Sequence, residues 1–223
     1  MSDEVYIESP KDIERAFGSI GLKVGPRTGP KKRTKEDKEW YVLRRFMPAA
    51  FSLGLFECPL RVLKRNPPEP DFALRSTSHL SSLEVTEATH PADQKEMTKF
   101  ELSENADLIG THGGRFRAGA SGNHPERAWA QDVIDAIMRK KGKSTFSKSY
   151  HRHLVIYPNS NASSLMFGDE DELEAYGLLI ERTRGQRDAL LSLVNGCQVH
   201  ILGKSFSFLD ILGQEKRIFA ASK

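Results

Sequence analysis

The sequence predicts a mixed α/β domain in which helices flank a central sheet. Three observations favour this class. Segments 35–54 and 125–143 carry apolar residues at helical spacing. Between them lie short segments in which apolar and polar residues alternate, as in strands buried on one face. Residues 153–159 form a continuous apolar run, which is typical of a strand buried on both faces.

The N-terminal part divides into a tail and the start of the domain. Residues 1–34 are rich in Gly, Pro and Lys, and we expect a basic, flexible tail with a short helical stretch at 13–17. Residues 35–223 then form a single domain. Its first helix begins at Lys35, is kinked or broken near Pro48, and stops around Gly54.

Three short strands follow the first helix. "PLRVLKR" alternates like a strand, "DFAL" is a second strand, and "SLEVTEA" is a third. The turn sequences "NPPEP" and "STSH" separate them. We therefore expect an antiparallel three-stranded meander over residues 59–88.

The second half of the chain begins with a long glycine-rich loop at 103–125 and the helix "PERAWAQDVIDAIMRKKGK", which Gly142 ends. The apolar strand 153–159 comes next. One or two helices over 169–196 and a strand pair, "QVHILG" and "FSFLDILG", complete the chain. The resulting order is helix, three strands, helix, strand, helix and two strands.

Composition excludes several protein classes. Apolar residues make up 38% and charged residues 28%, so the chain has enough apolar surface to fold. No apolar run approaches the ~20 residues that span a bilayer, and no signal peptide is evident. Cys58 and Cys197 form neither a disulfide framework nor a metal-ligand spacing. We expect a cytoplasmic, intracellular protein without a membrane partner.

Charge is distributed unevenly around a net value of +3. Segments 25–35 and 139–153 are basic, and segment 168–174 is acidic. Basic stretches of this kind can contact phosphate backbones, or they can be solvated surface. Charge alone leaves these two interpretations open.

Two carboxylates stand in or beside the predicted strands. Asp71 follows Pro70, and Glu84 lies between Leu83 and Val85. If the strands that carry them are neighbours, Asp71 can approach Glu84, and two carboxylates so close would repel each other. Mg²⁺ would remove this repulsion, because it prefers carboxylate oxygens together with water and phosphate. The alternative is that both acids are exposed at strand ends.

"PDF" at 70–72 and "LEVTEA" at 83–88 resemble the motif of the PD-(D/E)XK nuclease superfamily, which has the restriction-endonuclease-like fold. The family's order of one helix, three strands, one helix and one strand (αβββαβ) is similar to residues 35–158. The resemblance implies that Asp71 and Glu84 hold Mg²⁺ or Mn²⁺ beside the scissile phosphate, with the carbonyl of Val85 as a third ligand. It also implies a metal-dependent nuclease that acts on DNA.

The third motif position departs from the family pattern, because Thr86 stands where the family has Lys. In variants of the superfamily this lysine comes from the following helix, and "AIMRKKGK" resembles the end of that helix. We prefer Lys140, whereas the helical wheel places Lys141 at the centre of the buried stripe. Lys141 therefore stays open, as does the alternative that both lysines only favour the helix dipole.

The remaining candidates concern metal, DNA and assembly. Glu39 in the first helix is a further metal or water ligand by resemblance, or else a solvated acid. A homodimer stays open. Two other interpretations of the motif stay open as well. One is a decayed nuclease fold that binds nucleic acid or supports assembly, and the other is a chance match in an unrelated α/β domain. The DNA backbone contacts that we expect come from Lys31, Lys32, Arg33, Arg115 and Arg117.

Overall fold

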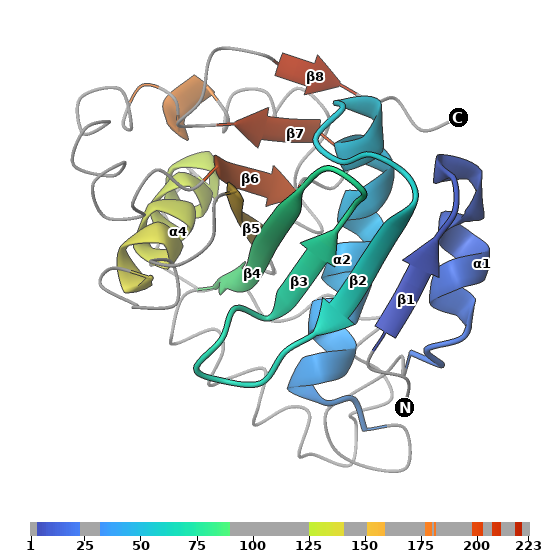
Figure 1. Ribbon diagram of the computed structural model, residues 1–223. Coiled ribbons are helices and arrows are strands. Elements are labelled where there is room, and N and C mark those ends of the chain that lie inside the picture. The colour runs from blue at the N-terminus through green and yellow to red at the C-terminus, as the bar shows by residue number, and fades with distance from the viewer. Residues whose placement is uncertain are drawn as a thin grey trace.

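A computed structural model gives an α/β fold built on one mixed sheet (Figure 1). The sheet has eight strands, and their order in space follows their order in the chain. The structure describes residues 4–22, 32–89, 125–140, 151–158, 177–179, 181, 198–202, 207–210 and 217–219.

The sheet has a parallel centre and antiparallel sides. β4 pairs with β5, and β5 with β6, in parallel, while all other neighbouring strands pair antiparallel. The expected antiparallel meander is confirmed as β2 to β4, and the expected C-terminal strand pair as β6 and β7. The strands are β1 (Glu4–Ile7), β2 (Leu60–Lys64), β3 (Phe72–Arg75), β4 (Leu80–Ala88), β5 (His151–Pro158), β6 (Gln198–Leu202), β7 (Ser207–Asp210) and β8 (Arg217–Phe219).

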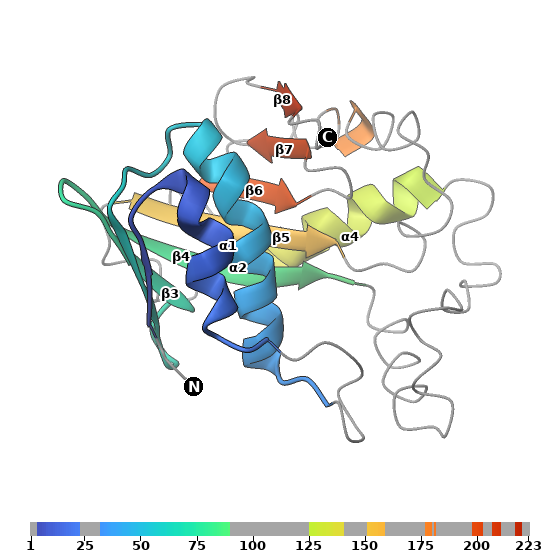
Figure 2. The same ribbon diagram turned by 90° about the vertical axis from the view of Figure 1, so that its right-hand side faces the viewer.

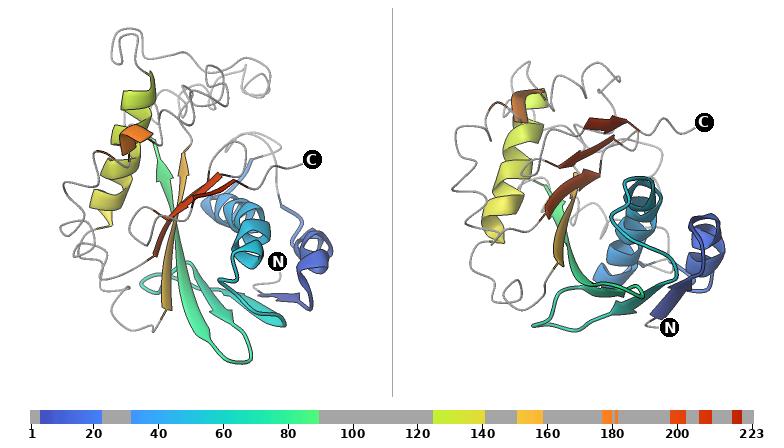
Figure 3. Two further views of the ribbon diagram at one scale, coloured as in Figure 1. Left: turned by 90° about the horizontal axis from the view of Figure 1, so that it is seen from above. Right: turned by 45° about the horizontal axis from the view of Figure 1, so that its top comes forward.

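Helices cover both faces of the sheet (Figures 2 and 3). α1 (Ile13–Gly18), which follows the short 3₁₀ helix η1 (Pro10–Asp12), and α2 (Lys35–Ser52) lie on one face. α4 (Pro125–Arg139) lies on the other face and packs against β4 and β5. The central strand β5 is therefore buried on both sides, as its apolar sequence predicts.

α2 begins with a capping box. Thr34 Oγ1 accepts from the backbone N–H of Asp37, and the Asp37 carboxylate accepts from the backbone N–H of Thr34. Of the kink or break expected near Pro48, the break is wrong, because the helix continues to Ser52. Pro48 lies near the C-terminal end, where it removes only one hydrogen bond, and the buried side chains around it keep the last turns packed against the sheet.

The expected flexible tail is wrong for residues 4–22, although the short helix expected at 13–17 is confirmed as α1. β1 pairs with β2, and η1 and α1 follow it. Ile7, Phe17 and Ile20 are buried in the main core. β1 is too short for its alternation to stand out in the sequence, and its stability comes from pairing with a strand more than fifty residues away. Residues 23–31 lie outside the described residues.

The core on the α2 face centres on Trp40. Its ring contacts Phe72 from β3 and Phe17 from α1, with ring centroids 4.7 and 6.1 Å apart. These three buried rings connect α1, α2 and the sheet. They fix the position of the first turns of α2, which carry several charged side chains to one end of the sheet.

Candidate active site

The β3–β4 pairing brings Asp71 and Glu84 together. Phe72 pairs with Leu83, so the next positions, Asp71 and Glu84, lie opposite each other. The backbone N–H of Asp71 donates to Glu84 Oε2 at 3.3 Å, and the backbone N–H of Val85 donates to Asp71 Oδ2 at 2.8 Å. Both acids are buried, with exposed fractions of 9% and 6%. They are not exposed acids at strand ends.

Lys140 reaches Glu84 from the end of α4, which lies on the sheet face opposite α2. Its Nζ lies 2.5 Å from Glu84 Oε1 and 3.4 Å from the carbonyl oxygen of Val85. α4 ends at Arg139, and the backbone N–H of Lys140 donates to Ile137 O at 3.0 Å, as in a tighter 3₁₀-type turn. The wheel that favours the neighbouring lysine assumes a regular helix, which has already ended here. Lys141 lies outside the described residues.

Lys64 is a site residue that our reading of the sequence missed. Its Nζ lies 2.8 Å from Glu39 Oε2, donates to Asp71 O at 3.0 Å, and lies 3.8 Å from Asp71 Oδ1. The signal was present in "PLRVLKR": Leu60, Val62 and Lys64 alternate, so Lys64 continues the buried face of β2. A lysine in that position requires an acid nearby.

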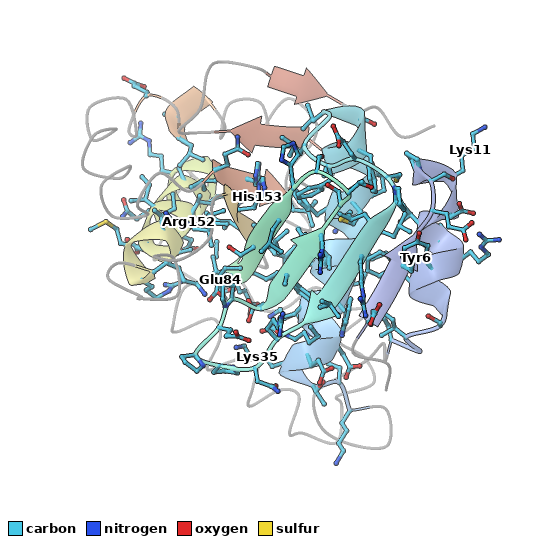
Figure 4. All side chains as sticks on the ribbon, in the orientation of Figure 1. Tyr6, Lys11, Lys35, Glu84, Arg152 and His153 are labelled. Atoms are coloured by element: carbon cyan, nitrogen blue, oxygen red, sulfur yellow. The ribbon has the colours of Figure 1, made fainter. Side chains whose placement is uncertain are left out.

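Glu39 also lies at the site, although its sequence pattern is that of an ordinary helix acid. Its buried carboxylate contacts Lys64 through Oε2, and its Oε1 lies 3.1 Å from Lys35 Nζ. Figure 4 shows Lys35 and Glu84 at the same end of the sheet. The site therefore combines three carboxylates with three lysines that come from α2, β2 and the end of α4.

The electrostatics of Asp71 follow from this crowding. Burial, together with the negative charges of Glu84 and Glu39, raises the pKa of Asp71 to about 6, although the Val85 N–H and Lys64 oppose the rise. Burial alone would lower the pKa of Lys35, but the negative charges of Glu39, Asp71 and Glu84 raise it. The acids thus outweigh the nearby cations at Asp71, and an additional cation would be stabilised there.

The donor atoms at the site suit a hard divalent cation. Asp71 and Glu84 offer carboxylate oxygens, and the Val85 carbonyl oxygen lies beside them, within reach of the same Lys140 amine. Mg²⁺ is commonly bound by one or two carboxylates plus water and substrate phosphate. Within the described ranges, no group of three or more His, Cys, Asp or Glu residues has the arrangement to hold a metal.

The expected DNA-contacting residues are only partly described. Lys32 is exposed and Arg33 is half-buried, and both directly precede the cap of α2. Lys31, Arg115 and Arg117 lie outside the described residues. Thr86 is half-buried on β4, and the amine that contacts Glu84 comes from Lys140, directly after α4.

A second pair of buried polar side chains lies on the neighbouring strands β5 and β6. His153 Nδ1 lies 3.0 Å from His200 Nε2, and the ring centroids of Phe56 and Phe46 lie 5.0 and 5.2 Å from those of His153 and His200. Burial and then His153 lower the pKa of His200 well below its usual value. The surroundings are aromatic, as for histidines with a structural role.

Comparisons of the chain with protein-family models, with curated proteins and with solved structures found no match. In the part of the chain that the structure describes, none of the helices is long and apolar enough to cross a membrane. The function of the chain is therefore inferred from the geometry of the site.

Proposed function

We propose that this chain is a metal-dependent nuclease that hydrolyses phosphodiester bonds of DNA, with a restriction-endonuclease-like core. The observation that supports the proposal is that Asp71, Glu84 and Lys140 meet although they come from three separate elements. The order α2, β2, β3, β4, α4, β5 also agrees with the αβββαβ order of the nuclease superfamily.

The residues present fit a metal ion. Asp71 and Glu84 would hold Mg²⁺ or Mn²⁺ with the Val85 carbonyl, since all three supply hard oxygen donors. When bound, such an ion would lower the pKa of a water molecule and neutralise charge on the phosphate.

The chain's own groups orient these ligands and supply further positive charge. The Val85 N–H holds Asp71 Oδ2, and the Asp71 N–H holds Glu84 Oε2, so the two carboxylates are fixed relative to the β3–β4 backbone. Lys140 places an ammonium beside Glu84, where it would donate to a phosphate oxygen as negative charge develops. The Lys64 amine contacts both the Glu39 carboxylate and the backbone carbonyl of Asp71, and so links α2 to the start of β3.

One observation favours a second candidate, a nucleic-acid-binding or assembly module without catalysis. Glu84 is paired with Lys140, and Glu39 with Lys35 and Lys64, so protein groups already provide cationic partners for these two acids. Thr86 at the usual lysine position agrees with this candidate. The two candidates differ in whether bound DNA is cut.

Cleavage assays separate the two candidates. The purified chain is incubated with supercoiled plasmid, linear duplex and single-stranded DNA, in Mg²⁺, Mn²⁺ or chelator. We expect cleavage only with metal, loss of cleavage in Asp71→Ala, and wild-type rates in Glu8→Ala, an exposed acid beyond β1. Binding of DNA without any cleavage would favour the module, and metal-independent cleavage would contradict both the site and its chemistry.

A further inference from the structure

Tyr41 is an aromatic side chain left partly open on α2. Its exposed fraction is 40%, although most apolar side chains of this helix are buried. The ring meets Tyr157 edge-on, with centroids 6.3 Å apart, and the guanidinium carbon of Arg45 lies over one face of the ring, 5.8 Å from its centroid. The ring is thus held on two sides while part of it remains accessible. A nucleobase stacks readily on such a ring.

Positive charge surrounds the two tyrosines. Burial and Tyr41 raise the pKa of Tyr157, while Arg45 and Arg33 lie close enough to oppose that rise. Glu87 also faces Tyr157, but its carboxylate is ion-paired with Lys38. The cations therefore outnumber the acids here, and the surroundings favour a phosphate group.

The aromatic pair lies close to the carboxylates. Tyr157 pairs with Glu87 in the β4–β5 register, and Glu87 follows Glu84 by three residues, or ~10 Å of strand. Along α2, the distance from Lys35 to Arg45 is ~15 Å. The Lys35 side chain is 80% exposed even though its amine lies beside Glu39. We call the row of accessible α2 side chains that leads away from the site the α2 stripe: Lys35, Tyr41 and Arg45, with the buried Lys38 between the first two.

We propose that the α2 stripe binds an unpaired DNA strand, with one base stacked on Tyr41 and phosphates near Arg45 and Lys35. The inference rests on the proposed function, because it names the form of the substrate at the same site. An unpaired strand is favoured over a duplex because stacking on Tyr41 requires the face of a base, which a duplex hides between its neighbours.

The first test is direct binding in chelator, measured by fluorescence anisotropy with a labelled single-stranded oligonucleotide and with the matching blunt duplex. Tyr41→Ala should weaken single-strand binding about 5- to 100-fold and duplex binding far less. Tyr41→Phe should bind like the wild type, since stacking does not need the hydroxyl. The matched control is Tyr6→Ala, which removes a tyrosine that is 53% exposed on β1, far from Glu84 (Figure 4).

Salt dependence distinguishes stacking from charge. Tyr41→Ala should leave the slope of log affinity against log salt unchanged, whereas Arg45→Gln should reduce that slope by about 1. Thermal unfolding of each variant verifies that it is folded. Three results would overturn the proposal that the α2 stripe binds an unpaired strand. The Tyr41→Ala variant could bind the single strand like the wild type, or it could lose duplex and single-strand binding equally. The third such result is a wild type that binds no single strand.

The binding assay also separates this inference from the proposed chemistry. A wild type that binds single strands through Tyr41 but cuts no DNA with metal contradicts the nuclease and supports the α2 stripe. A wild type that cuts DNA, with single-strand binding that is insensitive to Tyr41, supports the nuclease and contradicts the α2 stripe.

Discussion

Two lysines, the buried Lys140 and the half-buried Lys64, approach the same pair of acids from opposite sides, and their surroundings differ. Lys140 comes from the end of α4 and contacts Glu84 Oε1 and the Val85 carbonyl, two of the groups that we propose as metal ligands. Lys64 comes from β2 and contacts Glu39 and the backbone carbonyl of Asp71. The amine of Lys140 thus lies beside two of the proposed metal ligands, whereas the amine of Lys64 contacts Glu39 and the main chain of Asp71.

This difference indicates a division of roles. A cation beside the reacting atoms matters most in the transition state, and one behind the ligands matters for the folded protein before any substrate binds. Removing Lys140 should therefore affect turnover, and removing Lys64 should affect stability.

The largest effect is expected for the acids themselves. Asp71→Ala and Glu84→Ala should each reduce cleavage to the level seen in chelator, because each removes a proposed metal ligand, while DNA binding is retained. Plasmid nicking and anisotropy measure the two properties. Near-normal rates in either variant would show that the acid is not a ligand and would remove the basis for comparing the lysines.

Lys64→Met should lower the free energy of unfolding by about 3 to 5 kcal/mol, because it leaves the buried Glu39 carboxylate without one of its partners. Chemical denaturation measures the change. The double variant Lys64→Met/Glu39→Gln should recover much of the loss, since the second substitution removes the buried charge. A single variant as stable as the wild type would mean that Lys64 is not a structural partner of Glu39.

Lys140→Ala should reduce turnover about 10²-fold, equivalent to about 2.7 kcal/mol, with little change in DNA affinity. Lys11→Ala is the matched control, because Lys11 is exposed near α1 on the far side of the sheet (Figure 4). Single-turnover kinetics isolate the chemical step. If affinity falls instead and the salt slope flattens, Lys140 contacts only the phosphate backbone.

The smallest effect concerns Asp71 in the metal-free protein. Its pKa rises from 3.8 to about 6 on folding, so the folded state holds this proton more tightly than the unfolded state does. The carboxyl group therefore makes the fold less stable as the pH rises through that window. Asp71→Asn should be about 1 to 3 kcal/mol more stable than the wild type at pH 7, and the difference should vanish below about pH 4. A difference independent of pH would contradict the raised pKa.

The sequence predicted the parts of the site that are local in the chain. Asp71 directly precedes β3 and Glu84 lies on β4, its neighbour in one meander, so strand alternation allowed their approach if the strands paired, and the resemblance favoured that pairing. Lys140 required the resemblance as well, because helical periodicity favoured Lys141 and could not foresee the tight turn after Arg139. Whether these residues perform catalysis stays a prediction.

The missed features depend on contacts distant in sequence. Lys64 joins the site through Glu39, twenty-five residues before it, and through a β2–β3 register that alternation alone does not fix. β1 and β8 are short strands that pair with partners whose position the local sequence does not reveal. Lys35 and Lys64 were not among the predicted site residues, and only the fold brings their amines to Glu39, which the resemblance had offered as a further ligand.

The pairing of β1 with β2 has a consequence for self-association. β1 covers the side of β2 that would otherwise present unpaired N–H and C=O groups over Leu60–Leu63. An uncovered strand edge is a template for pairing with another chain. A version of the protein that begins after α1 would expose that edge together with the apolar surface that Ile7 and Phe17 cover. In the described sheet β1 is itself the edge strand, and at four residues it is of the short kind that limits pairing with another chain.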